Sequence, residues 1–262
     1  ILADPGVSLD SHARQHEVLE LIRTAAPEAA VIETVFSPTQ ALVRALGGSV
    51  IEYFKVDPAL AHRTISRVAD ALARYAAGLE EFVVVAHDPR PEIPVNTRFG
   101  IERTDLMVGE PTQEHVTAAL DVLKAAAIAA IQDGEPVWFA CDVAKQREKK
   151  SGVWDAALHD YEGLYGVELS MTKAERLVAR ESALTHAMCL TGVDLLDNAP
   201  RRWRVENSWG DKLGEKGFHT MNDSWFDEYV YQVVVRASRL PDEVRAALEV
   251  EPVMLPSWDP MF

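Results

Sequence analysis

From Pro136 onward, apolar and polar residues alternate with a period of two in a series of short segments. Glycine and Asn/Asp residues separate these segments, as is typical of turns between neighbouring strands. Short strands in such close succession favour an antiparallel barrel or a curled sheet. The segments that predict strands are residues 137–142, 185–193, 203–206, 217–220 and 229–236.

The first 130 residues show the longer period of amphipathic helices. Helices are predicted where an N-cap residue and a proline precede a periodic segment that ends at glycine. A short apolar run at 82–86 predicts a buried strand, and a proline-rich loop follows at 88–94. The predicted helices are residues 39–46, 59–77 and 114–132.

The end of the chain contains Pro256 and Pro260, which exclude a helix there. We expect residues 255–262 to form an extended arm, anchored by the large side chains of Trp258, Met261 and Phe262. The expected organisation is therefore a mainly helical region, a strand-rich region, and a short helix followed by the arm. The corresponding ranges are 1–134, 135–240 and 241–262.

Composition argues against several classes of partner. The chain carries 41 acidic and 26 basic residues, a net charge of −15, which opposes binding to a phosphate backbone. The longest apolar run lies within residues 124–131, far short of the roughly 20 residues that span a bilayer. Two cysteines imply no disulfide framework, which favours a cytoplasmic location. The first residue is Ile, so we expect a processed, truncated or incompletely sequenced product.

His186 and Asn207 form the pattern most suggestive of chemistry. His186 lies in a segment of small apolar residues, and Asn207 opens an Asn-Ser-Trp-Gly turn ahead of a Gly-Phe strand start. An Asn oxygen can accept a hydrogen bond from one ring nitrogen while the other nitrogen faces a sulfur, and Trp209 can shield that bond from water. A histidine alone on a strand is more often a packed core residue. The joint pattern instead predicts His186 as general base and acid, with Asn207 orienting it.

Three further segments extend this pattern: residues 133–145 (DGEPVWFACDVAK), 171–177 (MTKAERL) and 255–261 (LPSWDPM). Together with Asp-Pro-Arg-Pro at 88–91, they resemble the bleomycin hydrolase and bacterial aminopeptidase C group of papain-like cysteine peptidases. The resemblance implies a papain-like α+β fold, with helical insertions and an antiparallel barrel domain. It implies a cytoplasmic aminopeptidase that cleaves peptides through a thioester and forms a homo-hexamer. It also implies that the arm lies in the cleft, with Trp209 and Phe262 contacting substrate.

The sequence departs from the family pattern in one decisive respect. The nucleophilic cysteine of the family and the glutamine just before it have no counterpart here, and we expect the helical domain that carries them to be missing from these residues. We expect this chain alone to be inactive. Relatives also continue beyond Asp-Pro-Met with several small residues, whereas this chain ends at Phe262, which would weaken gating by the arm.

Other candidates favour structural roles. Cys141 and Cys189 lie in apolar strands and are expected to be packed. A zinc site built from them and His186 lacks paired-ligand spacing, so neither a metal nor a cofactor is expected. Asp142 and Asp194 fit turn positions. A basic run, interrupted by Glu148, is expected to be a solvated loop; it comprises Lys145, Arg147, Lys149 and Lys150.

Two other functions stay open at this point. The chain could be a catalytically inactive homologue with an assembly or scaffold role, which a start codon just before Ile1 in the gene would favour. It could also contact nucleic acid, for which salt-dependent retention on DNA would be the evidence.

Overall fold

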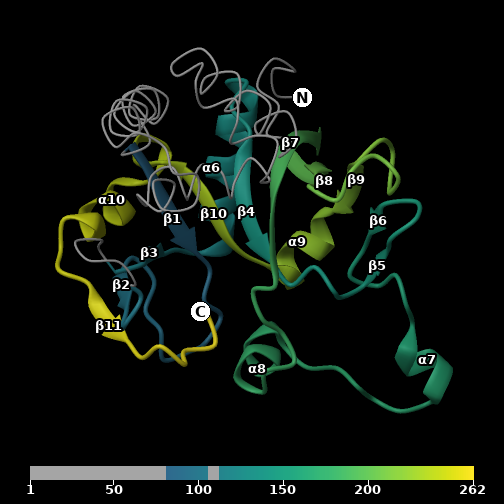
Figure 1. The fold of residues 1–262 in the computed structure, drawn as a ribbon, viewed down its shortest axis with the longest axis horizontal. Coiled ribbons are helices and arrows are strands. Elements are labelled where there is room, and N and C mark those ends of the chain that lie inside the picture. The colour runs from purple at the N-terminus through teal and green to yellow at the C-terminus, as the bar shows by residue number, and fades with distance from the viewer. Residues whose placement is uncertain (1–80, 106–111) are drawn as a thin grey trace, which may run out of the picture. The chain divides into compact units, whose positions relative to one another are not determined.

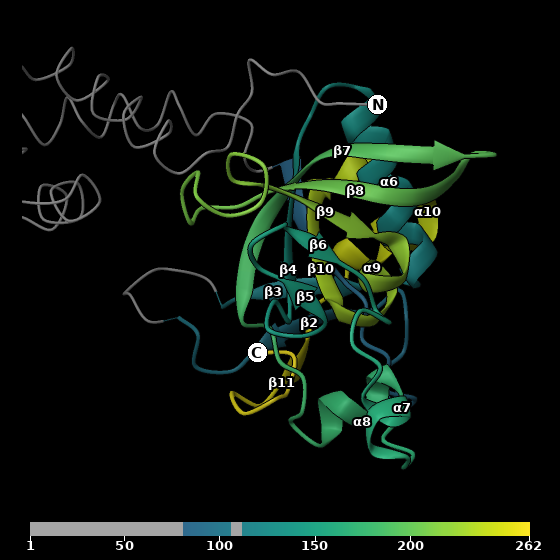
Figure 2. The same ribbon diagram turned by 90° about the vertical axis from the view of Figure 1, so that its right-hand side faces the viewer.

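The computed structural model describes residues 81–105 and 112–262, and Figures 1 and 2 show it from two sides. The helices expected at 39–46 and 59–77 lie outside the described residues. Eleven described strands join one sheet in the order β11-β2-β3-β1-β10-β4-β7-β8-β9-β6-β5. The strands are β1 (Phe82–Ala86), β2 (Arg98–Ile101), β3 (Glu114–Thr117), β4 (Val137–Cys141), β5 (Arg147–Glu148), β6 (Val153–Trp154), β7 (His186–Leu196), β8 (Ala199–Glu206), β9 (Phe218–Asn222), β10 (Val230–Arg236) and β11 (Val253–Leu255).

Short helices connect or cover these strands. They are α6 (Leu120–Gln132), α7 (Tyr161–Tyr165), α8 (Lys173–Val178), α9 (Asp223–Tyr229) and α10 (Asp242–Leu248), with a 3₁₀ turn, η3, at Ala237–Arg239. α6 packs against β4, β7 and β10, while α9 contacts β8, β9 and β10. None of the helices in the described part of the chain has the length and apolar character that a membrane span requires.

The central six strands, from β1 through β10, β4, β7 and β8 to β9, pair antiparallel throughout. Parallel pairs occur only outside this central run of the described sheet: β3 with β1, β11 with β2, and β6 with β9. The antiparallel sheet predicted from the two-residue period is therefore present within a mixed sheet. The hydrogen-bonded order has two ends, β11 and β5, and closure into a barrel stays a prediction.

The hairpin between β7 and β8 is longer than the sequence predicted. Its turn residues, Asp197 and Asn198, have φ values of 51° and 64°, a left-handed conformation that Asp and Asn tolerate better than most residues. The strand expected to start at Trp203 begins instead at Ala199, because pairing with β7 continues to Leu196. The exposed stretch that includes Arg201 carries no hydrophobic alternation from which this extension could be predicted.

The prediction of a helix over residues 114–132 was wrong for its first residues. Residues Glu114–Thr117 form β3, and α6 begins only at Leu120. Val116 matches the helical spacing of the apolar stripe in α6, but it is fully buried between β1 and β2. Sheet pairing on both sides outweighs the local helical pattern there. The described part of residues 1–134 thus holds three strands and one helix, while the domain boundary at 134 stays a prediction.

A large apolar core lies beneath α6 and α9, and three fully buried tryptophans, Trp154, Trp203 and Trp225, contribute to it. A second, smaller cluster joins β1, α8, β10 and the C-terminal residues. Its members are Ala86, Leu177, Tyr231 and Met261, with Leu184 packed against them.

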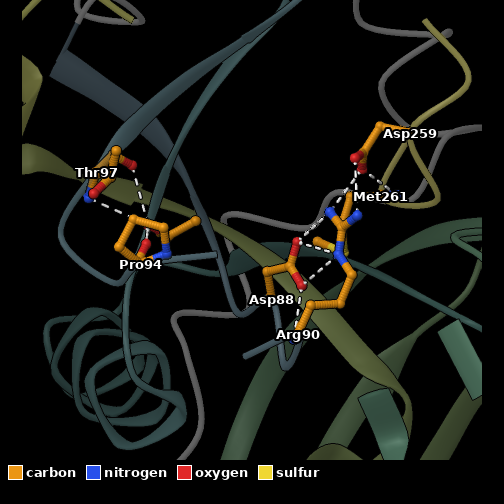
Figure 3. A network of polar contacts seen from close by, with 7 residues as sticks. Asp88, Arg90, Pro94, Thr97, Asp259 and Met261 are labelled. Atoms are coloured by element: carbon orange, nitrogen blue, oxygen red, sulfur yellow. Dashed lines mark hydrogen bonds and ion pairs between the residues drawn. The ribbon is translucent and has the colours of Figure 1, made fainter. Parts of the chain in front are cut away.

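The prediction of an extended arm over residues 255–262 was wrong beyond Leu255. β11 pairs with β2 up to Leu255, and the chain then makes two successive turns, with Asp259 N donating to Pro256 O and Phe262 N donating to Asp259 O. Proline excludes a helix but suits a turn, since its φ is preset, and the Asp259 side chain accepts from Met261 N at 2.9 Å. Figure 3 shows this end of the chain beside Asp88 and Arg90.

The C-terminal side chains do not all anchor the chain as expected. Met261 is buried, as the sequence predicted, whereas Trp258 and Phe262 are 69% and 54% exposed. The anchors that replace them are polar. Asp259 forms a buried ion pair with Arg90, and Arg180 donates to the carbonyl of Trp258.

Three histidines of the fold are held uncharged by burial. Desolvation, followed by the nearby charge of Lys173, lowers the pKa of His87 from 6.5 to about 4, and desolvation also lowers the pKa values of His115 and His219. Between about pH 4 and 6.5 the unfolded chain therefore binds more protons than the native one at His87, and the lowered pKa values of His115 and His219 act in the same direction. Native stability should consequently fall as the pH falls through this window.

We expect the melting temperature, followed by circular dichroism, to decrease on acidification from pH 7 to pH 4. His87→Gln should flatten this dependence, because it removes one of the groups that gain a proton on unfolding. His159→Gln is the matched control, since His159 is exposed. Identical pH profiles for the wild type and His87→Gln would contradict the assignment.

Candidate active site

His186 and Asn207 are brought together by the β7–β8 hairpin. His186 is the first residue of β7, and Asn207 directly follows β8. Because Cys189 of β7 pairs with Glu206 of β8, the start of one strand lies beside the end of the other. The register of the hairpin therefore determines where the two side chains meet.

The contact between the two side chains is a hydrogen bond. His186 Nε2 lies 3.0 Å from Asn207 Oδ1, as expected from the sequence pattern. Asn207 is buried, and its backbone N–H donates to Gly217 O at 3.2 Å, which fixes the residue to the loop ahead of β9. His186 itself is half-buried.

The neighbouring Ser208 determines the direction of this hydrogen bond. Its backbone N–H donates to Asn207 Oδ1 at 2.8 Å, so the atom that faces the ring must be the amide oxygen. An oxygen acceptor requires a proton on His186 Nε2, which leaves the Nδ1 lone pair available in the neutral ring. Nδ1 is therefore the atom that can accept a proton from a reacting group.

Trp209 covers this pair. Its ring stacks on the His186 ring with centroids 4.7 Å apart and an interplanar angle of 20°, while 40% of the residue stays exposed. The loop that carries it needs glycine at Gly217, whose φ is 87° and where a Cβ would lie 3.1 Å from Gly210 O. The Asn-Ser-Trp-Gly and Gly-Phe motifs are thus two sides of one close backbone contact.

Neither cysteine is placed to act as a nucleophile. Cys141 is fully buried, its thiol donates to the backbone oxygen of His186 at 3.7 Å, and burial raises its pKa well above the ordinary value. Cys189 is also buried, and both residues are free of disulfides. The packing roles expected from the sequence are the ones observed. In the described residues, no three His, Cys, Asp or Glu side chains form a group suited to a metal.

Phe262, unlike Trp209, does not stack on His186. Within the described residues, its ring makes no aromatic contact with His186 or Trp209. Its neighbour Met261, however, belongs to the smaller hydrophobic cluster described above. Leu184, which precedes His186 by two residues, packs against that cluster. The end of the chain therefore lies on the side of the sheet from which β7 starts.

A series of buried hydrogen bonds that supports the start of β7 could not be predicted from the sequence. Tyr231 donates to Ser182 Oγ, and Ser182 donates to Asp142 Oδ2, both at 2.9 Å and both buried. Val143 N also donates to the hydroxyl of Thr185 at 3.2 Å. Asp142, interpreted from the sequence as a turn residue, therefore fixes the segment that leads into His186. Its partners are remote in the sequence, so no local signal identifies them.

A histidine oriented by an asparagine beneath a tryptophan is the arrangement expected above for a papain-like peptidase, and comparison with known proteins identifies the family of this chain. The model of the Peptidase C1-like family matches residues 62–262, and the chain belongs to this family. The relatives that it matches in this family include bleomycin hydrolases and aminopeptidases C.

The relatives give this placement its detail. The chain is 46% identical over 187 residues to bleomycin hydrolase of Homo sapiens and 39% identical over 183 residues to aminopeptidase C of Listeria innocua. The matches cover 70% of this chain but only 41% and 42% of the relatives, so the chain spans about two fifths of their length. The crystal structure of PepW from Lactobacillus rhamnosis has the same fold, with a TM-score of 0.69 at 29% identity, over 86% of this chain and 60% of PepW.

Proposed function

We propose that this chain supplies the imidazole half of the active site of a cysteine aminopeptidase, and that the nucleophilic cysteine lies outside these 262 residues. The observation that carries the proposal is the hydrogen bond between His186 Nε2 and Asn207 Oδ1, covered by Trp209. The burial of both cysteines supports the second part. The names of the relatives, bleomycin hydrolase and aminopeptidase C, support peptides with a free amino terminus as the substrate class.

In the proposed reaction, His186 Nδ1 accepts the thiol proton and holds the thiolate in an ion pair. The thiolate attacks the scissile carbonyl carbon, and the imidazolium returns the proton to the leaving amine as the C–N bond breaks, which leaves a thioester. His186 then takes a proton from water, whose oxygen attacks the thioester, and the proton returns to the thiolate as the acid is released. Asn207 keeps Nδ1 directed at the sulfur throughout, while Trp209 and Phe262 contact the substrate.

The test is a chimera in which this chain replaces the matching part of human bleomycin hydrolase, so that the remainder supplies the nucleophilic cysteine. The chain alone should show no turnover of aminoacyl fluorogenic substrates, whereas the chimera should hydrolyse them. Cys141→Ala should leave the chimera active, because the Cys141 thiol is sealed in the core. Turnover by the isolated chain that is lost on Cys141→Ala would contradict the proposal.

An inactive assembly protein is the second candidate. Residues 160–170, which include α7, are exposed throughout, although they carry the large apolar side chains of Tyr161, Leu164, Tyr165, Val167 and Leu169. An exposed apolar segment of this kind suits contact with another subunit. We therefore propose that the protein forms a homo-oligomer, whether it acts as a peptidase or as an assembly protein. A correctly folded chimera that binds but never hydrolyses substrate would favour the assembly role.

A further inference from the structure

Arg147 contacts the same tryptophan ring that stacks on His186. Its guanidinium carbon lies 4.8 Å from the centroid of the Trp209 ring, and Trp209 in turn stacks on His186 at 4.7 Å. The guanidinium and the imidazole thus both contact the indole of Trp209. An arginine over a tryptophan face is a favourable cation–π pair, and tryptophan is the strongest aromatic partner for it.

The guanidinium of Arg147 contacts the Trp209 ring and forms no ion pair with another described residue. Its Nε and Nη1 atoms are buried and have no hydrogen-bond partner among the described residues, and no carboxylate of these residues pairs with it. Covering a cation without an anionic partner costs free energy, and the indole face offsets part of that cost. Its only described aromatic contact is with Trp209.

The backbone of Arg147 is fixed more firmly than the loop of Trp209. Arg147 pairs with Trp154 across the β5–β6 hairpin, and Trp154 pairs with Met221 of β9. Trp154 is fully buried and packs on Trp225 with ring centroids 4.9 Å apart. Trp209, by contrast, is 40% exposed in a loop. Through Arg147, the core-anchored β5–β6 hairpin therefore supports the exposed ring of Trp209.

We propose that Arg147 is a positioning residue of this site. It acts through Trp209, holding the indole flat over the His186 Nε2–Asn207 Oδ1 hydrogen bond so that water is kept from that bond. Its significance for catalysis rests on the proposed function, but the physical claim concerns this chain alone. The basic segment 145–150 thus contains one side chain with a specific contact at the site, whereas Lys149 and Lys150 are exposed.

The test measures exchange of the His186 Nε2 proton with water by NMR in the full 262-residue chain. Arg147→Met should accelerate this exchange about two- to fivefold, as the loss of one cation–π pair allows. Trp209→Leu should accelerate it further, and the double variant should match Trp209→Leu, because Arg147 acts only through the indole. Arg147→Lys, which keeps the charge without the planar stack, should lie between Arg147→Met and wild type. Lys149→Met removes the same charge from an exposed neighbour and should change nothing.

Arg147→Gln provides a second variant if Arg147→Met does not fold, as judged by its melting temperature. Unchanged exchange in a folded Arg147 variant, or an Arg147→Met effect that persists in the Trp209→Leu background, would overturn the proposal. A chimera that lacks peptidase activity while these exchange effects are present would count against the proposed function only.

Discussion

Replacing Arg90 by methionine is expected to lower the free energy of unfolding by about 3–5 kcal/mol, the usual cost of leaving a buried charge without its partner. Arg90 lies between two buried carboxylates. Its Nη2 atom is 2.6 Å from Asp88 and 2.9 Å from Asp259, and its Nε and Nη1 atoms make further bonds to the same two residues. All three side chains are at most 8% exposed, so the remaining carboxylates could not be solvated without local unfolding.

Urea unfolding at pH 7 measures this cost. Arg201→Met is the matched control, because Arg201 pairs with Asp194 on the surface, where the side chains are 52% and 45% exposed, and should cost less than about 1 kcal/mol. Arg90→Met should also make the C-terminal residues sensitive to carboxypeptidase, since Asp259 links them to the loop after β1 (Figure 3). Equal costs for the two arginine variants would contradict the assigned role of the buried pair.

His186→Ala is expected to reduce kcat of the chimera on the order of 10⁴-fold, because one imidazole performs both proton transfers. Asn207→Ala should have a smaller effect, about 10²-fold, since the ring remains but loses its orientation. KM should change little in both variants, as neither residue is proposed to bind substrate. His159→Ala is the control histidine, and it should retain full activity because it is exposed and, within the described part of the chain, makes no hydrogen bond or ring contact with His186 or Asn207. An Asn207→Ala enzyme with unchanged kcat would contradict the orienting role.

Strands of the central sheet could be predicted from their own residues, either as alternation, as in β9 and β10, or as a continuous apolar run, as in β1. β3 could not be predicted in this way, since Val116 also fits the helical stripe that continues into α6. Only its pairing with β1 and β2 decides between the two periods. The C-terminal turns were missed for a related reason: Pro256 and Pro260 exclude a helix but allow both an extended chain and turns.

The contact between His186 and Asn207 could be predicted because both belong to one hairpin with a recognisable motif. Arg90 and Asp259 are 169 residues apart, and Arg147 meets Trp209 only through β5, β6 and β9. Such contacts depend on tertiary structure alone. The resemblance drew attention to Asp-Pro-Arg-Pro and Trp-Asp-Pro-Met as separate motifs, and the structure shows that their charged residues form one ion-pair network.

The pH dependence of thiol alkylation in the chimera tests the central claim most directly. A cysteine paired with an imidazolium has a pKa far below the ordinary value of about 8.5, so iodoacetamide should react with the wild-type chimera even at pH 5 to 6. In His186→Ala this reactivity should disappear and return only as the pH approaches about 8.5. A reactive thiolate at low pH that persists in His186→Ala would show that His186 is not the base of this site.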